Sequence, residues 1–330
     1  MSITILKPGI MSSVQDLGRW GYQQYGVPVG GAMDKISASL ANIICGNDEN
    51  EAVIEITLHG TTILFNEAMY CALVGGGCKA YVDEVELPFN RLLHIPAYSV
   101  ITTKPSARGC RMYLSIAGGF NIKKEMGSAS TYVPSGIGGM LGRNLISGDI
   151  IPFSKKGRDT PASSMKMIGK NTYASHWEVP DLHLQEKNAE IIHILSGPEF
   201  DLFQSISQEK LLNATFTISS QSNRMGYRLE GTKLELKEKA EMVSTPVTAG
   251  IIQVTHEGNP IILMADAQTT GGYPRIARVA STDIAKLAQM RPGMKIRFKK
   301  ISEEESKQMN REVLEIMKKM KNGLVLPRIN

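Results

Sequence analysis

Short runs of aliphatic and β-branched residues, each followed by glycine, proline or polar turn residues, recur along the chain and limit its possible folds more than any other feature. Eight runs are clear, at residues 53–57, 61–65, 69–74, 111–116, 191–195, 251–254, 261–264 and 294–298. Runs of this length and composition are typical of strands in antiparallel sheets and barrels. The pattern lacks the regular alternation of strand and helix of a doubly wound sheet, so we expect a mainly β protein.

Two short segments have the spacing of amphipathic helices. Residues 33–45 repeat apolar side chains about one turn apart and stop at Gly46, and residues 282–290 stop before Pro292. Glycine and proline at these positions are ordinary signals for the end of a helix. We therefore predict only a few short helices in this part of the chain.

The strongest helix signal comes near the end of the sequence. Ser302 and Glu305 have the spacing of a capping box, which marks the first turn of a helix. An apolar stripe runs along this helix, formed by Met309, Val313, Ile316 and Met320. The stripe predicts that the helix docks either on its own domain or on a partner chain.

Length and composition indicate two globular domains. The chain has 330 residues, of which 42% are hydrophobic and 21% charged, and a chain of this size buries a sufficient core without disulfides or a structural metal. A polar, punctuated stretch follows Phe153 and is the best boundary. We predict a first β-barrel half at 1–153, a linker at 154–190, a second half at 191–300 and a terminal helix and tail at 301–330.

A weak internal repeat suggests that the two halves are related. Segments 13–22 and 219–227 share a glutamine, an Arg-x-Gly-Tyr sequence and a downstream glycine. Each is followed by a strand that runs into a glycine cluster, at 72–77 and at 263–272. Two related β-barrel halves would explain the match, and a chance agreement of a few positions is the alternative.

Charge and targeting signals exclude several classes of function. The net charge is +5, and the aromatic residues, 6% of the chain, do not alternate with a Lys/Arg stripe as in nucleic-acid-binding proteins. No stretch of about 18 apolar residues could span a membrane. The N-terminus has no basic segment followed by an apolar core. We expect a cytoplasmic protein that binds neither nucleic acid nor membranes.

The first segment that could carry chemistry is 15–34, where polar side chains lie among glycines. Arg19 is a candidate catalytic residue, because its fork can bind a carboxylate or phosphate and it has few local partners. Asp16 is either catalytic or the cap of a turn. Asp34 either binds substrate or caps the following helix. Tyr22 is a further candidate for substrate binding.

The second segment, 264–275, follows an apolar strand directly and presents polar side chains at the mouth of a sheet. Asp266 could act as a base or could simply cap the strand end. Paired threonines before paired glycines could form an oxyanion cradle of hydroxyls and backbone amides. The catalytic candidates are Asp266, Gln268, Thr269 and Thr270, and the binding candidates are Gly271, Gly272 and Tyr273.

A third cluster, at 118–120 and 127–143, is long and rich in glycine and hydroxyl side chains. Long ordered loops of this kind usually bind or cover something. The candidates for substrate binding here are Gly118, Gly119, Ser130, Tyr132 and Arg143.

Several reactive or catalytic features are missing from the sequence. It has no P-loop, no G-x-S-x-G elbow and no histidine pair spaced for zinc, so we predict no metal site. We expect reduced, buried thiols at the four unpaired cysteines, Cys45, Cys71, Cys78 and Cys110.

Ser164-Met-Lys-Met167 resembles the biotinylated sequence of carrier domains, but it lies in the predicted linker without flanking strand pairs. We therefore expect no biotin on this chain.

Taken together, the glycine-rich and polar segments resemble those of the KipA family. This family includes the second-subunit type of allophanate hydrolase, the C subunit of 5-oxoprolinase (PxpC) and half of the carboxyltransferase domain of urea carboxylase. The resemblance runs from residue 3 to residue 298. It is carried by Pro8-Gly9, Ser13–Arg19, Gly21-Tyr22, 26–28, 31–34, 46–47, 117–120, 130–132, 222–226 and 268–274.

The resemblance implies a pair of cyclophilin-like β-barrels and a KipI-type (PxpB-like) partner whose own barrel completes the site. It adds Asn223 and Arg224 as candidate binding residues. Two positions depart from the family pattern: Ala129 stands where we expect arginine, and Thr255 stands where proline usually follows Ile-Gln-Val. The first departure puts an anion-binding role of the 127–132 loop in doubt.

The resemblance also implies an activity, and here the family divides. We favour a subunit of a heteromeric, ATP-dependent 5-oxoprolinase that opens the pyroglutamate lactam. It would be inactive alone and would act with the KipI-type subunit and a lactam-hydrolase (PxpA-like) subunit, with ATP bound at the level of the complex. One alternative is a regulatory protein that sequesters a KipI-type kinase inhibitor. The other is a carboxyltransferase subunit acting on urea or another amide.

Overall fold

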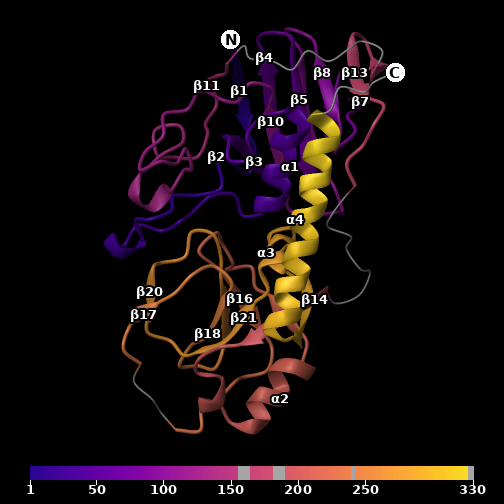
Figure 1. Cartoon of the computed structure of the whole chain (residues 1–330). Coiled ribbons are helices and arrows are strands. Elements are labelled where there is room, and N and C mark those ends of the chain that lie inside the picture. Colours follow the sequence, from indigo (N-terminus) through magenta and orange to yellow (C-terminus); the bar gives the residue numbers. More distant parts are fainter. Residues whose placement is uncertain (155–163, 181–189, 239–241, 326–330) are drawn as a thin grey trace. The chain divides into compact units, whose positions relative to one another are not determined.

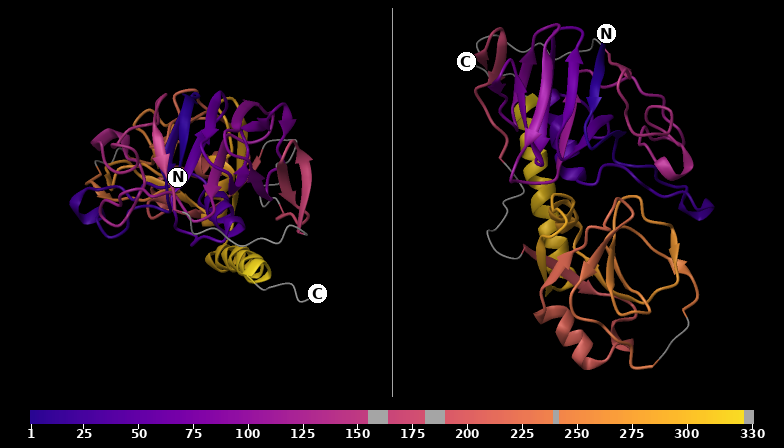
Figure 2. Two further views of the ribbon diagram at one scale, coloured as in Figure 1. Left: turned by 90° about the horizontal axis from the view of Figure 1, so that it is seen from above. Right: turned by 180° about the vertical axis from the view of Figure 1, so that it is seen from behind.

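The computed structural model describes residues 1–154, 164–180, 190–238 and 242–325, and the chain divides into two compact units (Figure 1, Figure 2). The first unit comprises Met1–Arg19, Asp34–His183 and Glu315–Asn330, and the second comprises Trp20–Met33 and Leu184–Leu314. Neither unit is one continuous stretch of sequence. This differs from the predicted boundaries, because Trp20–Met33 belongs with the second unit and not with the first half.

Two facing sheets build the first unit. Its strands are β1 (Ser2–Pro8), β2 (Met11–Gln15), β3 (Val53–Thr57), β4 (Thr61–Phe65), β5 (Met69–Gly75), β6 (Cys78–Val82), β7 (Val85–Glu86), β8 (Leu92–Ile95), β9 (Val100–Pro105), β10 (Arg111–Ile116), β11 (Ile150–Pro152), β12 (Met165–Gly169) and β13 (Thr172–Ser175). They form a six-stranded sheet, β11-β1-β4-β9-β6-β7, and a seven-stranded sheet, β12-β13-β8-β5-β10-β3-β2. One apolar core contains Ile3 and Phe65 of the first sheet together with Ile54 and Leu114 of the second. The predicted first barrel half is thus a pair of sheets packed face to face around this core.

Helix α1 (Lys35–Cys45) packs against β5 and β10 of the seven-stranded sheet. It begins at Asp34, whose side chain accepts a hydrogen bond from Ser37 N, and it ends at Gly46, whose φ of 74° is the left-handed conformation that glycine adopts readily. The helix predicted at 33–45 is therefore confirmed. Asp34 caps its first turn, and the helix ends at Gly46 as predicted.

A closed barrel of seven strands forms the second unit. Its strands are β14 (Glu190–Ser196), β15 (Phe216–Ile218), β16 (Gly226–Glu230), β18 (Ile251–Val254), β19 (Pro260–Leu263), β21 (Arg275–Val279) and β22 (Lys295–Lys300). The order around the barrel is β14-β21-β18-β19-β16-β15-β22, and parallel pairing of β14 with β22 closes it. A separate two-stranded ladder joins β17 (Thr245–Pro246) to β20 (Thr270–Gly271). The mainly β class and a barrel in the second half are confirmed.

The remaining helices of the described residues are α2 (Ser205–Asn213), α3 (Ser281–Ala288) and α4 (Glu303–Val325), and short 3-10 turns lie at Gln23–Tyr25, Val133–Ser135 and Phe200–Leu202. Helix α2 was not predicted, because only Ser207 and Leu211 of this helix are buried and no apolar stripe marks it. No described helix is both long enough and apolar enough to cross a membrane.

The capping box of α4 is formed as predicted. Glu305 N donates to Ser302 Oγ at 3.1 Å, and Ser302 N donates to Glu305 Oε2 at 2.7 Å. In the second unit, Met309 of the predicted stripe packs on a small cluster of Leu195, Ala280 and Ile301. This part of the helix therefore docks on its own chain.

The predicted linker is wrong over residues 165–175. Strands β12 and β13 form a hairpin there, and Tyr173 pairs with His94 of β8, which adds the hairpin to the seven-stranded sheet. Lys166 is exposed within β12 and pairs with Ala174, so it does have a flanking strand pair. The flanking polar stretches of the linker, at 155–163 and 181–189, lie outside the described residues.

All four cysteines are free and buried, as predicted. Burial raises the pKa of the Cys78 thiol to about 12 and raises the pKa of the Cys71 thiol well above its ordinary value. Since the thiolate is the reactive form, these two thiols are unreactive at neutral pH.

Replacement of the α4 cap tests its contribution to stability. Ser302→Ala should lower the free energy of unfolding by about 1 kcal/mol, because the first turn loses its side-chain acceptor. Ser220→Ala, at an exposed turn, should change it by less than about 0.5 kcal/mol. Chemical denaturation measures both, and equal stabilities of the two variants would show that the capping box contributes nothing.

Candidate functional site

The predicted site residues fall into two groups, one in each unit. The first unit holds Asp16, Arg19, Asp34, Gly118, Gly119, Ser130, Tyr132 and Arg143. The second unit holds Tyr22, Asn223, Arg224, Asp266, Gln268, Thr269, Thr270, Gly271, Gly272 and Tyr273. Each group has its own set of contacts.

The carboxylate of Asp16 is buried at the end of β2 and gathers four donors. Its Oδ1 accepts from Gly18 N at 2.8 Å and from Ser128 Oγ at 2.7 Å. The other two donors are Ser130 Oγ, at 2.5 Å, and Ala129 N, at 2.7 Å. The Asp16 carboxylate thus holds its own turn and the segment 128–130 together through hydrogen bonds. This supports the interpretation of Asp16 as the cap of a turn. Ala129, where arginine was expected, is fully buried.

Arg19 is fully buried, and its hydrogen-bond acceptors are supplied by residues distant in the sequence rather than by local partners. Its Nε donates to the carbonyl of Glu125 at 3.0 Å, and its Nη2 donates to the carbonyl of Ser130 at 2.9 Å. A Cβ at Gly138 would lie 2.8 Å from Nη2, so glycine is required beside the guanidinium. These contacts favour a structural role for Arg19 over a ligand-binding role.

Asp34 and the glycines at 118 and 119 also have structural partners. Both carboxylate oxygens of Asp34 are used by Ser37, through its N at 2.9 Å and its Oγ at 2.6 Å. Gly118 N donates to Asn47 Oδ1 at 2.9 Å, and Gly119 N donates to the carbonyl of Ile116 at 2.9 Å. Asp34 is therefore a helix cap, and the two glycines form a turn after β10.

Arg143 and Tyr132 lie in the glycine-rich segment of the first unit. Arg143 makes a two-pronged pair with Asp149, with both N–O distances at 2.8 Å, and these hydrogen bonds hold the pKa of Asp149 below its ordinary value. The backbone of Tyr132 exchanges hydrogen bonds with Ile137. The carboxylate partner of Arg143 is thus supplied by its own loop.

At one end of the barrel, Arg224 and Asp266 form the most enclosed polar contact of the second group. Arg224 Nε donates to Asp266 Oδ2 at 2.8 Å and Arg224 Nη2 donates to Oδ1 at 3.0 Å, while Asp266 is 5% exposed. Arg224 Nη2 also donates to the carbonyl of Gly31 at 2.6 Å. This contact ties the segment Trp20–Met33 to the barrel. Arg224 thus occupies both carboxylate oxygens of Asp266, and this geometry argues against Asp266 as a general base.

The loop after β19 presents neutral hydrogen-bonding groups at the same end of the barrel. Gln268, Thr270 and Tyr273 are exposed, and Thr269, Gly271 and Gly272 are half-buried. The ladder between β17 and β20 pairs Thr245 with Gly271, so part of the predicted backbone cradle is used within the protein. The side chains of this loop, rather than all of its amides, are available for a ligand.

The other two members of the second group lie in turns. Asn223 is exposed, and its Oδ1 accepts from Met225 N at 2.8 Å and Gly226 N at 3.3 Å, which closes the turn before β16. Tyr22 is half-buried, and its carbonyl accepts from Tyr25 N at 3.0 Å.

We call the loop after β19, residues 268–273, the barrel-end loop. Several residues beside it were not predicted from the sequence. The His256 and Tyr273 rings pack edge to face with centroids 5.3 Å apart. Glu199 accepts from Arg275 Nη2 at 2.6 Å and from Arg275 Nε at 2.8 Å. Gln253, in β18, is buried under the loop. None of these has a local sequence signal, because each partner is distant in the chain.

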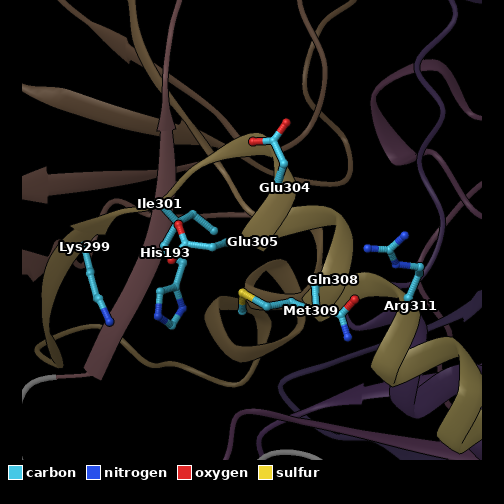
Figure 3. Close-up of a pocket in the computed structure, with 8 residues that line it drawn as sticks. All are labelled: His193, Lys299, Ile301, Glu304, Glu305, Gln308, Met309 and Arg311. Carbon is cyan, nitrogen blue, oxygen red and sulfur yellow. The ribbon is translucent and has the colours of Figure 1, made fainter.

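A separate pocket of about 570 Å³ lies between the barrel and the first turns of α4 (Figure 3). It is lined by His193, Lys299, Ile301, Glu304, Glu305, Gln308, Met309 and Arg311. His193 Nδ1 pairs with the buried Asp283 Oδ2 at 2.8 Å. Glu305 is committed to the capping box, and its hydrogen bonds to Ser302, with Lys299 and His193 nearby, lower its pKa. The pocket thus contains charges that largely balance one another at the base of α4.

Within the part of the chain that the structure describes, no group of three or more His, Cys, Asp or Glu side chains could hold a metal ion. The exposed side chains of the loop after β19 are the hydroxyl of Thr270, the amide of Gln268 and the phenol of Tyr273. Such groups bind and polarise a planar carbonyl compound by donating hydrogen bonds to its oxygen.

The buried contacts of Arg19 predict a loss of stability when it is replaced. Arg19→Lys should lower the free energy of unfolding by about 2 kcal/mol, because an ammonium cannot reproduce the planar fork that reaches both carbonyls. Arg297→Lys, at an exposed position of β22, should leave stability within about 0.5 kcal/mol of the original. Chemical denaturation compares the two, and an unperturbed Arg19→Lys protein would restore the ligand-binding role.

The pair of Glu199 and Arg275 predicts a stability that depends on pH. Hydrogen bonds from Arg275 hold the pKa of Glu199 below its ordinary value. A carboxyl group with a lowered folded-state pKa stabilises the protein above its unfolded-state pKa, and that contribution is lost as the pH falls through the folded-state pKa.

Glu199→Gln should therefore lower the free energy of unfolding by about 2 kcal/mol at pH 7. The deficit should shrink below about pH 4, where the original carboxyl group also becomes protonated. Glu230→Gln, at an exposed position of β16, is the control and should show no deficit. Denaturation curves at both pH values measure this, and a deficit that does not change with pH would rule out the ionic contribution.

Comparison with known proteins shows which family this chain is similar to. The family model described as carboxyltransferase domain, subdomain A and B, matches residues 25–300. The C subunit of 5-oxoprolinase from Escherichia coli K12 is 40% identical over 304 residues, which cover 92% of this chain and 93% of that protein. The protein of the same name from Haemophilus influenzae is 34% identical, covering 94% of each.

Larger fungal proteins contain a similar region. Urea amidolyase of Saccharomyces cerevisiae is 30% identical and matches 100% of this chain but only 18% of its own length. The crystal structure of Kluyveromyces lactis urea carboxylase matches with a TM-score of 0.86 at 28% identity, over 99% of this chain and 30% of that chain. The expected resemblance is thus confirmed: this chain belongs to the carboxyltransferase-domain family, subdomains A and B, together with the C subunits of the bacterial 5-oxoprolinases.

Proposed function

We propose that this protein is a subunit of a heteromeric, ATP-dependent 5-oxoprolinase that opens the pyroglutamate lactam. The observation that carries the proposal is the 40% identity to the Escherichia coli 5-oxoprolinase C subunit, which extends over more than nine-tenths of both chains. We further propose that it acts with a KipI-type subunit and a lactam-hydrolase-type subunit, and that ATP is bound by the complex.

The chemistry of lactam opening suits the neutral donors at the barrel end. In the proposed reaction the lactam oxygen takes the γ-phosphoryl group of ATP and ADP leaves. Water then adds to the activated carbon, the ring C–N bond breaks, and a second water releases phosphate from the resulting acyl phosphate to leave glutamate. Negative charge develops on oxygen during these steps, and donors aimed at that oxygen lower the barrier. The hydroxyl of Thr270 and the amide of Gln268 are exposed and suited to this task.

The hydrogen bonds of the two candidate catalytic carboxylates support the proposal that this chain needs partner subunits for activity. Asp16 is enclosed by four donors and Asp266 is paired with Arg224. Neither is arranged to take a proton from water. We propose that the partner subunits supply the proton acceptor and the nucleotide site.

Reconstitution tests this function directly. The chain, its pair with a KipI-type protein and the full set of three are purified and assayed with 5-oxo-L-proline and ATP for glutamate and ADP. We expect both products from the full set and none from the chain alone. Failure of the folded proteins to associate at micromolar concentration, or an active chain by itself, would overturn the subunit proposal.

Carboxyl transfer to an amide is the second candidate, and the match to urea carboxylase favours it. It requires a biotin carrier, and Lys166 is the residue of this chain whose neighbours resemble a carrier sequence. We expect Lys166 to remain unmodified, because it lies within strand β12 and not at the tip of the hairpin. Intact-mass measurement after co-expression with a biotin ligase checks this. A biotin mass on wild-type protein that Lys166→Arg removes would favour carboxyl transfer over lactam opening.

A substitution at the barrel end tests the proposed oxyanion donor. Thr270→Val removes one hydroxyl at nearly constant volume and should lower kcat of the reconstituted enzyme by about 10²-fold with little change in KM. Thr215→Val is the matched control, because Thr215 is also exposed and lies directly before β15, away from the 268–273 loop in sequence. Equal activity of both variants would remove Thr270 from the catalytic set.

A further inference from the structure

We propose that Gln253 is a positioning residue that sets the place of the barrel-end loop 268–273. It is 2% exposed and lies in β18 directly beneath that loop. It was not among the predicted site residues, and its side chain donates to the loop backbone, at the carbonyl of Tyr273. Its effect on the exposed groups of the loop runs through the backbone that carries them.

The side-chain amide of Gln253 makes one hydrogen bond and one close contact with the loop. Its Nε2 donates to the carbonyl of Tyr273 at 3.1 Å. A Cβ placed on Gly271 would lie 2.6 Å from Nε2 and 3.2 Å from Oε1, so the amide rests directly on the Gly271 backbone. Only glycine at position 271 lets the loop backbone approach the Gln253 amide this closely. The amide therefore holds the loop backbone at two residues, Gly271 and Tyr273.

An irregularity in the pairing of β18 with β21 directs the Gln253 side chain toward the loop. Ile252 pairs with Ala277, but Gln253 pairs with Arg275, so β21 contains one extra residue opposite this step. A bulge of this kind bends the strand and redirects side chains, and bulges are frequent beside active sites. Val254 N donates to the carbonyl of Pro274 at 3.0 Å, which joins β18 to the end of the loop.

The opposite side of the loop is held by a different element. Thr245 of β17 pairs with Gly271, and Val247 N donates to the carbonyl of Thr269 at 2.9 Å. The loop is thus held between β17 on one side and the Gln253 amide on the other. Removal of one support should let Thr270 and Tyr273 shift while the rest of the barrel stays folded. A shift of about 1 Å in a substrate-positioning group is enough to slow catalysis about 10²-fold.

Two variants test this role in complementary ways. Gln253→Met keeps the length of the side chain but removes its donor. Gly271→Ala keeps the donor but introduces a methyl group where the amide lies. Gln208→Met is the matched control, because Gln208 Nε2 also donates to backbone carbonyls, those of Phe200 and Phe203, at helix α2.

Amide hydrogen exchange of the purified chain is the primary measurement and does not depend on the proposed function. We expect exchange of residues 269–273 to accelerate at least about tenfold in Gln253→Met and Gly271→Ala. In both variants β14 and β22 should stay protected, and Gln208→Met should leave the loop unchanged. Unchanged exchange at 269–273, or equal acceleration across the whole barrel, would overturn the proposal.

The second measurement rests on the proposed 5-oxoprolinase function. In the reconstituted complex, kcat should fall about tenfold in Gln253→Met with a smaller change in KM, and Gln208→Met should match the original protein. A full set that does not open the lactam even with the original chain would refute the proposed function, while hydrogen exchange would still decide the role of Gln253. Faster loop exchange with unchanged kcat would show that Gln253 does not position groups for catalysis.

Discussion

Closure of the barrel in the second unit is the constraint on which the candidate site depends. β14 and β22 pair in parallel, from Glu190 with Ile296 to Ile194 with Lys300, and this ladder joins the first and last strands of the barrel. Because a closed barrel fixes strand order and register, the connections between strands collect at its two ends. The turn before β16 and the loop after β19 meet in this way. Arg224 can reach Asp266 although 42 residues separate them in sequence.

Buried charges organise the loops of both units. Asp16 and Arg19 are almost completely buried, and their side chains hydrogen-bond to donors and acceptors of the surrounding loops. An unpaired buried charge is far more costly than a paired one, so these contacts hold the loops in single arrangements. The ion pair of Glu199 and Arg275 acts similarly beside β21. Charged residues that suggest catalysis in the sequence thus serve largely to build the fold.

The groups left accessible at the barrel end are mostly neutral, and this agrees with a shared active site. Hydroxyls and amides can bind a planar lactam and stabilise charge on its oxygen. Phosphoryl transfer and proton abstraction require further groups, which we propose that partner subunits supply. In the fungal urea amidolyases a region similar to this chain makes up about a fifth of a much longer polypeptide. The C subunits of the bacterial 5-oxoprolinases have nearly the same length as this chain.

Local sequence signals determined much of the secondary structure. All eight predicted strands are present, and the helices at 35–45, 281–288 and 303–325 lie where their spacing and end signals predicted them. Helix α2 and the other described strands, such as β1, β2, β6 and the hairpin of β12 and β13, were not predicted. The long motifs were also sufficient to identify the family, since they depend on residue identity and order alone.

The tertiary structure decided which polar residues are exposed and which are buried in contact with other parts of the protein. In the sequence Arg19 resembles a free fork between glycines, yet its acceptors belong to Glu125 and Ser130, more than a hundred residues away. Gln253 resembles an ordinary strand residue, yet its amide contacts the loop that carries Thr270. A side chain's exposure and hydrogen-bond partners depend on long-range packing, which no local pattern encodes. The sequence by itself therefore determined the clearest strands, three of the helices and the family, and only the folded chain determined the contacts of its polar residues.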